Sequence, residues 1–317
     1  MQERSRDRRE RWLFVTGANR SGTTWVGRML DEHPEVMVRG ECAFFREDAG
    51  IDWCTDAASV SGWVQGCSTS AALFCHIDPA SFAGADVREV VDRPYRRVFA
   101  PWAGVRVLGD RTPYHSCVCA DRLHAAFPDS VFVDVVRDGR DTAVSSAFKQ
   151  VMQRKSVEMW GGPARAEAVR CRIEEGARVD DGSGFRLFTD EALEFFARRW
   201  VRSVTGGERA SVLYGDRFVR LRYESLVEDA VPGIAMVFGL LGVADPVSNA
   251  RRAVERQRFE RVTGRARGRA EPGSLARSAS PGDWRSWFTA RDGMIFEGIA
   301  GKTLSRLGYA GDGAVAA

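Results

Sequence analysis

The feature that most constrains how this chain can fold is a glycine-interrupted loop between a short apolar segment and an amphipathic one. Residues 12–16 (WLFVT) are apolar and favour a β-strand, and from Thr24 onward apolar residues recur at helical spacing. The loop between them carries Gly17 and Gly22. A strand, a glycine-rich turn and a helix start direct backbone N–H groups and the positive helix end toward an anion. The sequence therefore predicts a phosphate- or sulfate-binding loop.

This loop departs from the phosphate loop of nucleotide-hydrolysing enzymes at one position. Its spacing from Gly17 to Thr24 matches G-x4-G-K-[ST], but Thr23 stands where that motif has lysine. The cation lies three residues earlier, at Arg20. Because the lysine that contacts the β- and γ-phosphates is missing, ATP hydrolysis is disfavoured. A nucleotide kinase-like phosphotransferase remains as an alternative.

A second anion site is predicted further along the chain. Residues 130–136 (SVFVDVV) have the continuous apolar pattern of a buried parallel strand. A helix is expected to follow, capped by Asp141 or Thr142. Arg137 at the strand end and Ser145 within the helix would together hold a tetrahedral dianion. Two such sites on one sheet predict a ligand with two separated phosphate-like groups.

Five segments, in order along the chain, resemble motifs of the sulfotransferases that use 3′-phosphoadenosine 5′-phosphosulfate (PAPS). They are RSGTTWV (20–26), VVRDGRDTAVS (135–145), LRYESL (221–226), RFERVTG (258–264) and LARSASPGDWRSWF (275–288). The resemblance runs from about residue 12 to residue 309 and implies the P-loop-like α/β fold of bacterial-type members. It departs from the family pattern at Ser278 and Ala279, which replace the lysine and glycine of RKG.

The resemblance also implies which residues bind the cofactor, with PAPS as donor and PAP as product. The 5′-phosphosulfate is assigned to the loop, the 3′-phosphate to the second site, and the adenine and late-loop contacts to the other segments. These residues are Arg20, Ser21, Gly22, Thr23, Thr24 and Trp25, then Arg137 and Ser145, then Tyr223 and Phe259, and lastly Arg277 and Gly282.

The catalytic base is assigned by a further resemblance. Residues 40–45 (GECAFF) resemble the E-x-x-F-F element of heparan 3-O-sulfotransferases, which implies that Glu41 is the base. Residues 109–114 (GDRTPY) are similar to their DKTPxY segment, which places Arg111 near the sulfonate. Arg20 would stabilise the leaving phosphate, although an arginine is a poor proton donor. His76 and His115 remain as alternative bases.

The order of the segments predicts one α/β domain with three layers, a central parallel sheet flanked by helices. Strands are expected at 13–15, 105–108, 131–136 and 219–222. The expected organisation is a flexible basic tail (1–10), a domain (11–309) with acceptor-side insertions (46–96 and 148–189) and a lid loop (263–281), and a second tail (310–317).

The amino-acid composition indicates which kinds of partner and which cellular compartment to expect. With 46 basic and 43 acidic residues the chain predicts no long basic cleft, so we expect a small-molecule or natural-product acceptor rather than a polyanionic glycan or nucleic acid. No apolar run approaches membrane-spanning length. The seven cysteines are scattered and form no C-x-x-C pair, which predicts reduced thiols in a cytoplasmic protein. The spacing of Cys67, Cys75 and His76 matches no standard zinc template, so we expect no metal.

The predicted function is therefore a cytoplasmic PAPS-dependent sulfotransferase that needs no metal. A non-catalytic PAP-binding protein is the alternative from another class, because fold alone does not establish function. The oligomeric state stays open, with a homodimer as one alternative.

Overall fold

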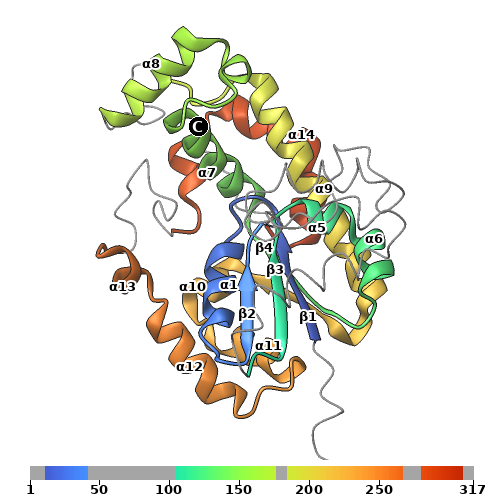
Figure 1. Cartoon of the computed structure of the whole chain (residues 1–317). Coiled ribbons are helices and arrows are strands. Elements are labelled where there is room, and N and C mark those ends of the chain that lie inside the picture. Colours follow the sequence, from blue (N-terminus) through green and yellow to red (C-terminus); the bar gives the residue numbers. More distant parts are fainter. Residues whose placement is uncertain (1–10, 42–103, 176–183, 267–279, 310–317) are drawn as a thin grey trace, which may run out of the picture. The chain divides into compact units, whose positions relative to one another are not determined.

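The computed structural model describes residues 11–41, 104–175, 184–266 and 280–309 of the 317-residue chain (Figure 1). The predicted insertion at 46–96, most of the predicted lid and both predicted tails lie outside the described residues. The described residues belong to two compact units, each assembled from separate stretches of chain. Unit 1 comprises Met1–Gly17, Gly22–Val135 and Thr205–Gln257, and unit 2 comprises Ala18–Ser21, Val136–Val204 and Arg258–Ala317.

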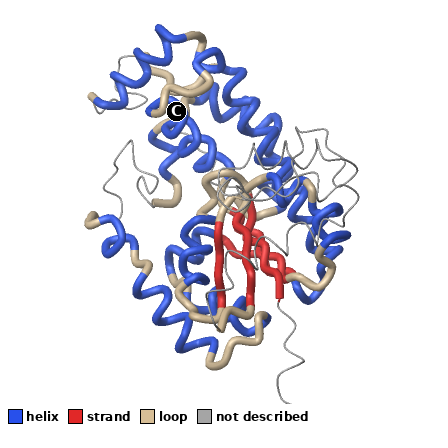
Figure 2. Tube along the Cα trace, viewed as in Figure 1, coloured by secondary structure: helices blue, strands red, loops and turns tan. Residues whose placement is uncertain are grey.

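Unit 1 contains the sheet. Its strands are β1 (Arg11–Gly17), β2 (Val36–Arg39), β3 (Val107–Arg111), β4 (Val131–Val136, whose last residue belongs to unit 2) and β5 (Phe218–Arg222). Its helices are α1 (Thr23–Asp31), α5 (His115–Val118), α6 (Ala120–Ala126), α10 (Tyr223–Glu228), α11 (Val231–Leu240) and α12 (Pro246–Arg256), with a 3-10 turn at Gly215–Arg217. The strand order is β2-β3-β1-β4-β5. Figure 2 shows the strands in red and the helices in blue.

The sheet pairs are parallel, as the sequence predicts. β1 pairs with β3 on one side and with β4 on the other, so that Val15 lies opposite both Arg111 and Val133. β2 pairs with β3, with Val36 opposite Val107. The predicted α/β class with a central parallel sheet flanked by helices is confirmed.

One face of the sheet packs against α1, α10, α11 and α12. Leu13 and Val15 alternate along β1 and join a buried cluster with Val133 of β4. The helices contribute other apolar members of the same cluster, which are Val26, Met29, Leu30, Leu226, Ile234, Phe238 and Ala250.

The opposite face is covered by aromatic packing. The ring of Phe127, which follows α6, lies 5.0 Å from Trp12 and 5.2 Å from Phe14. Phe132 of β4 lies 4.9 Å from Tyr214, the last residue of α9 (Asp190–Tyr214). Because helices cover both faces, unit 1 has the three layers expected of this class.

The strand predictions differ from the structure at two places. The sequence predicts no strand at β2, which has four residues. It predicts a strand at 105–108, whereas β3 begins at Val107 and continues through Gly109, Asp110 and Arg111. These three residues have low strand propensity, but β3 pairs with β1 on one side and with β2 on the other, and this pairing holds them in the sheet. The buried Asp110 carboxylate accepts a hydrogen bond from Thr112 Oγ1 at 2.7 Å.

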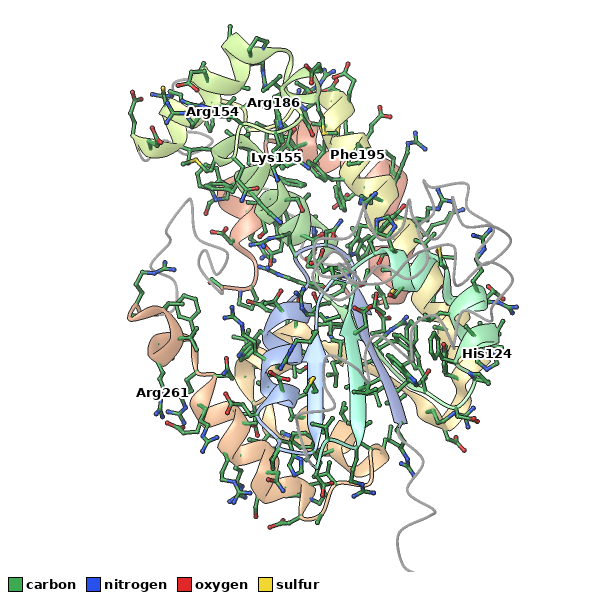
Figure 3. The ribbon with its side chains drawn as sticks, viewed as in Figure 1. His124, Arg154, Lys155, Arg186, Phe195 and Arg261 are labelled. Carbon is green, nitrogen blue, oxygen red and sulfur yellow. The ribbon has the colours of Figure 1, made fainter. Side chains whose placement is uncertain are left out.

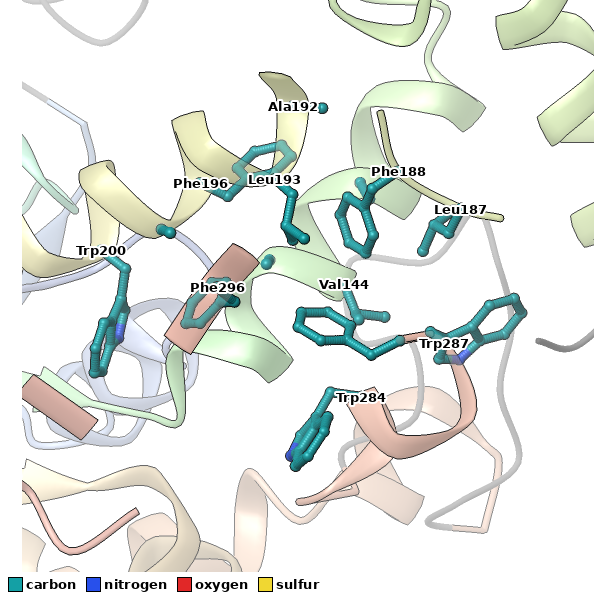
Figure 4. Packing of buried hydrophobic residues seen from close by; sticks show 14 of the residues in the cluster. Val144, Leu187, Phe188, Ala192, Leu193, Phe196, Trp200, Trp284, Trp287 and Phe296 are labelled. Atoms are coloured by element: carbon teal, nitrogen blue, oxygen red, sulfur yellow. The ribbon is translucent and has the colours of Figure 1, made fainter. Parts of the chain in front are cut away.

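Unit 2 is built around aromatic side chains (Figure 4). It contains α7 (Gly139–Met152), α8 (Pro163–Glu174), the first part of α9 (190–204), α13 (Phe259–Thr263) and α14 (Ala290–Arg306), with 3-10 turns at Val157–Trp160 and Asp283–Ser286. Trp160, Phe188, Trp284 and Trp287 are among the buried members of its core. The range 148–189, predicted as an acceptor-side insertion, therefore contributes helices and core residues to unit 2.

Candidate functional site

The glycine-rich loop has the backbone conformation that its sequence predicts. Gly17 (φ 144°) and Gly22 (φ 102°) have positive φ angles, and Arg20 between them lies at φ 71°. The N–H of Ser21 donates to the carbonyl of Ala18 at 3.1 Å. The Ser21 hydroxyl is fully buried and has no hydrogen-bond partner among the described residues. A buried hydroxyl of this kind is a candidate donor to a ligand.

The helix after the loop begins without a side-chain cap. Gly22 occupies the N-cap position of α1, and the first turn carries no acidic residue. Uncapped N–H groups at a helix start, together with the helix dipole, are suited to an anion. The loop passes from unit 1 into unit 2 at residue 18 and returns to unit 1 at Gly22.

In unit 2, three residues that were assigned to two different phosphate groups converge. Arg20 Nε donates to Ser145 Oγ at 3.0 Å, across 125 positions of sequence. Arg137 Nη1 donates to the backbone carbonyl of Arg20 at 3.4 Å. Arg137 is buried and forms an ion pair with Asp141, at 3.4 Å from Nη2 to Oδ2. These contacts place two guanidinium groups and a hydroxyl at one position in the fold.

The corner between β4 and α7 is capped by Asp138, not by Asp141 or Thr142 as expected. The Asp138 side chain accepts the Arg140 N–H at 2.9 Å, and it also pairs with Arg140 Nη2 at 2.8 Å. Burial raises the pKa of the Asp138 carboxyl, and the hydrogen bonds from Arg140 act in the opposite direction. Thr142 lies inside the helix and donates to the Gly139 carbonyl.

Trp200 holds this corner in place, and sequence reasoning missed it. Its Nε1 donates to the Arg137 carbonyl at 3.0 Å. A Cβ atom on Gly139 would lie 2.5 Å from the Trp200 ring, so only glycine fits there. Gly139 in the RDGR segment indicates that another side chain packs closely at this turn, but the sequence does not show which one.

Asp141 attaches the late GDW segment to α7. Its carboxylate accepts the N–H of Gly282 at 2.8 Å and that of Trp284 at 2.9 Å. Arg137 Nη2 donates to the carbonyl of Ser280 at 3.4 Å. Gly282, which the family resemblance assigns to the cofactor, therefore lies beside Arg137. Arg277 falls outside the part of the chain that the structure describes.

Two aromatic residues of the cofactor motifs meet in unit 1. The rings of Trp25 and Tyr223 lie edge to face at 6.4 Å, and a Cβ on Gly22 would be 2.7 Å from Tyr223 Cδ2. Trp25 Nε1 donates to the Gln257 carbonyl at 2.8 Å. Phe259 is buried in unit 2, with the Arg265 guanidinium 5.5 Å from its ring. The adenine contacts of Tyr223 and Phe259 stay predictions.

The two catalytic candidates of unit 1 form an ion pair. Arg111 Nη1 donates to Glu41 Oε1 at 3.1 Å, with 19% of the Arg111 side chain and 53% of the Glu41 side chain exposed. A Cβ on Gly40 would lie 2.3 Å from Arg111 Nη2, and one on Gly27 would lie 3.1 Å from its Cδ. The absence of side chains at Gly27 and Gly40 therefore leaves room for Arg111, and the Arg111 guanidinium pairs with the exposed Glu41 carboxylate.

His115 and His33 each pack against an aromatic ring. The ring of His115 at the start of α5 packs edge to face on Tyr114 at 5.3 Å. His33 Nδ1 accepts the Glu35 N–H at 3.2 Å, and its ring packs 5.5 Å from Phe238. His33 is thus structural. His76, Cys67 and Cys75 lie outside the described residues, so the base stays a choice between Glu41 and the two histidine alternatives.

Neither a metal site nor a membrane span is found in the part of the chain that the structure covers. Among these residues no three histidine, cysteine or acidic side chains form a group that could hold a metal ion. No helix in the described ranges is both long and apolar enough to cross a bilayer.

Comparison with known proteins identifies relatives along most of the chain. Residues 13–246 match the model of the sulfotransferase family. The nodulation protein NoeE of Sinorhizobium fredii is 25% identical over 303 residues, and the match covers 93% of this chain and 65% of that protein. The chain thus spans slightly less than two thirds of the length of that curated relative.

Solved structures with similar folds have lower identity. Mouse sulfotransferase SULT7A1 complexed with PAP is 13% identical with a TM-score of 0.49, covering 94% of this chain and 90% of that one. A sulfotransferase from Alicyclobacillus acidocaldarius is 18% identical with a TM-score of 0.43, covering 93% and 97%.

Proposed function

This chain belongs to the sulfotransferase family, and from that premise we propose that it transfers the sulfonate of PAPS to a hydroxyl group of a small-molecule acceptor. In this reaction the acceptor oxygen forms a bond to sulfur while the bond from sulfur to the 5′-phosphate oxygen breaks. The acceptor proton passes to the base, and PAP leaves with the negative charge.

The observation that carries the proposal is the hydrogen bond between Arg20 and Ser145. The sequence assigns Arg20 to the 5′-phosphosulfate loop and Ser145 to the 3′-phosphate site, and their side chains meet at 3.0 Å. With Arg137 bonded to the Arg20 carbonyl, unit 2 presents two permanent cations beside one hydroxyl. A nucleotide with phosphates at both ends of one ribose suits this arrangement.

In the proposed mechanism, Arg20 stabilises the charge that develops on the leaving phosphate. Glu41 accepts the proton of the acceptor hydroxyl, since its carboxylate is exposed and held by Arg111. Arg111 adds positive charge near the sulfonate and orients Glu41. Neither arginine is asked to donate a proton, because a guanidinium keeps its charge at any relevant pH.

Binding of PAP and of AMP separates the role of the 3′-phosphate from that of the fold. We expect Arg137→Ala to weaken PAP by about 2 to 3 kcal/mol, because a charge-assisted fork is lost, and Ser145→Ala to weaken it less. AMP lacks the 3′-phosphate, so its affinity should change little in either variant. Calorimetric titration checks this, with Arg209→Ala, which removes an exposed arginine paired with Asp121, as the control.

Two results would contradict the proposal. Equal losses for PAP and AMP would mean that Arg137 supports the fold rather than the 3′-phosphate. Binding of PAP without release of PAP from PAPS across a broad hydroxyl-acceptor panel would favour the non-catalytic alternative. The kinase-like alternative predicts a preference for ATP with Mg²⁺ over PAP.

A further inference from the structure

A pocket of about 370 Å³ lies within unit 2. Three segments line it: residues 18–20 of the loop, one face of α7 with the turn after it (142–155), and residues 195–200 of α9. Thr142, Ser146, Lys149 and Gln153 recur at helical spacing, so a single stripe of α7 faces the pocket. The volume is that of a small-molecule site.

The lining is cationic. It includes Arg20, Lys149, Lys155 and Arg199 and contains no aspartate or glutamate. The chain as a whole is nearly balanced, with 46 basic and 43 acidic residues, so this excess is local. A concave surface lined by one sign of charge attracts ligands of the opposite sign.

One wall of the pocket is aromatic, with Phe195, Phe196 and Trp200 in its lining. Figure 3 labels Phe195 of this wall. The side chain of Phe195 is 41% exposed, and its ring lies 5.6 Å from that of the buried Phe196. The guanidinium of Arg199 lies 5.9 Å from the Phe195 ring. Trp200 is oriented by its hydrogen bond to the Arg137 carbonyl. An exposed ring flanked by a cation is suited to a flat apolar group that itself carries negative charge.

Gln150 supplies a polar group for orientation. Its side-chain Oε1 is buried and has no hydrogen-bond partner in the described part of the chain. Buried acceptors of this kind are normally satisfied, so a donor from the occupant, such as a hydroxyl or an amide N–H, would complete it.

Arg20 connects this pocket to the reaction, since it lines the pocket and also donates to Ser145. We propose that the acceptor binds in this pocket and carries an anionic group, recognised by Lys149, Lys155 and Arg199, on a flat apolar body that lies against Phe195. The proposal rests on the proposed function and adds the chemical class of the acceptor to it. Carboxylate and phosphate groups share the required chemistry.

Three probes of one shape test the charge requirement: a hydroxynaphthoate, its neutral carboxamide and the corresponding phosphonate. Their dissociation constants are measured by calorimetry on the full chain saturated with PAP. We expect the two anionic probes to bind at least tenfold more tightly than the carboxamide, with a preference that shrinks as salt is added. Comparison of carboxylate with phosphonate shows which anion the lysines prefer.

The variant that tests the assignment is Lys149→Gln with Lys155→Gln, and the matched control is Lys302→Gln on the exposed surface of α14. The double variant should lose the preference for charged probes and keep the affinity for PAP, whereas the control should keep both. Equal binding of charged and neutral probes, a preference that survives the double variant, or no binding of any probe would overturn the proposal.

The two proposals fail in different ways. If PAP does not bind, the proposed function is wrong. If PAP binds and the anionic probes bind in a lysine-dependent way but no sulfated product forms from PAPS, the pocket stands and the transfer reaction is wrong. If a neutral acceptor is sulfated as well as its charged counterpart, the transfer reaction stands and the anionic acceptor is wrong.

Discussion

At the scale of single residues, the side chain of Arg111 lies between two glycines and pairs with Glu41. Gly27 and Gly40 flank its side chain, and a Cβ atom at either position would press against it. The guanidinium is thereby directed to Glu41, whose carboxylate stays half exposed. This exposure leaves the carboxylate accessible from solvent, as the proposed role of base requires.

Glu41→Gln should slow turnover by ~10²–10⁴-fold, because the amide keeps the shape of the side chain but accepts no proton. The affinity for PAP should stay near the wild-type value. Single-turnover rates with one accepted acceptor measure the effect, with His76→Ala and His115→Ala as comparisons. A Glu41→Gln rate within tenfold of wild type, alongside a nearly inactive histidine variant, would transfer the role of base to that histidine.

His33 should make stability depend on pH. Burial lowers its pKa, with Glu35 opposing and Arg252 adding to the shift, so the folded state prefers the neutral ring. As the pH falls through the unfolded value of about 6.5, the unfolded chain takes up the proton first. The stabilising contribution is therefore present above that pH and is lost as the pH falls through the lower pKa of the folded state.

The comparison to make is between wild type and His33→Asn, whose side-chain oxygen can still accept the Glu35 N–H. Urea unfolding between about pH 7.5 and pH 5.5 should show a steeper loss of unfolding free energy in the wild type than in the variant. Parallel pH profiles would mean that His33 titrates alike in both states.

At the scale of elements, the closeness of α9 to α5 and to β4 depends on two consecutive glycines. A Cβ on Gly206 would lie 2.4 Å from the carbonyl oxygen of Cys117, and one on Gly207 would lie 2.3 Å from Asp134 Oδ2. Asp134 is buried in β4 and pairs with Arg220 Nη2 at 2.8 Å. Glycine is costly in a helix interior, so its presence twice here reflects packing rather than helix propensity.

Gly206→Ala should therefore destabilise the protein by about 1 to 3 kcal/mol, since the added methyl group meets backbone that cannot rotate away. Gly239→Ala in α11 is the matched control, because nothing lies within 4 Å of the added atom. The control should be neutral or stabilising by up to about 1 kcal/mol. Urea midpoints measure both changes, and similar values for the two variants would contradict the packing argument.

At the scale of the whole molecule, the chain crosses five times between the two units, including twice within the glycine-rich loop. Each unit has its own apolar core, one around the sheet and one around the tryptophans of unit 2. A ligand that binds only the folded chain should raise its stability by mass action.

PAP at 100 times its dissociation constant should stabilise the folded protein by about 2.7 kcal/mol, without added metal. The measurement is thermal unfolding with PAP in the presence of a chelator. A clear shift with ATP and Mg²⁺ but none with PAP would contradict the proposed donor and favour a phosphotransferase.

The sequence alone determined the parallel α/β class, the glycine-rich loop between a strand and a helix, and the family. The first two follow from local physics, because the apolar period reports the type of element and glycine spacing reports where the backbone needs positive φ. The family follows from the resemblance of five segments to known motifs. The sequence missed the four-residue edge strand β2 and misplaced β3, where pairing with β1 and β2 overrides the weak strand propensity of its last residues. It also assigned the cap of α7 to Asp141 or Thr142, whereas Asp138 caps the helix and Asp141 accepts the N–H groups of Gly282 and Trp284.

Only the tertiary structure decided which side chains meet. The bond from Arg20 to Ser145 spans 125 positions and that from Trp200 to the Arg137 carbonyl spans 63, and no local pattern encodes contacts at such separations. The cationic pocket is a similar case, because a net charge of +3 conceals where the charges gather. Composition sums over the whole chain, whereas recognition depends on the few residues that folding places around one cavity.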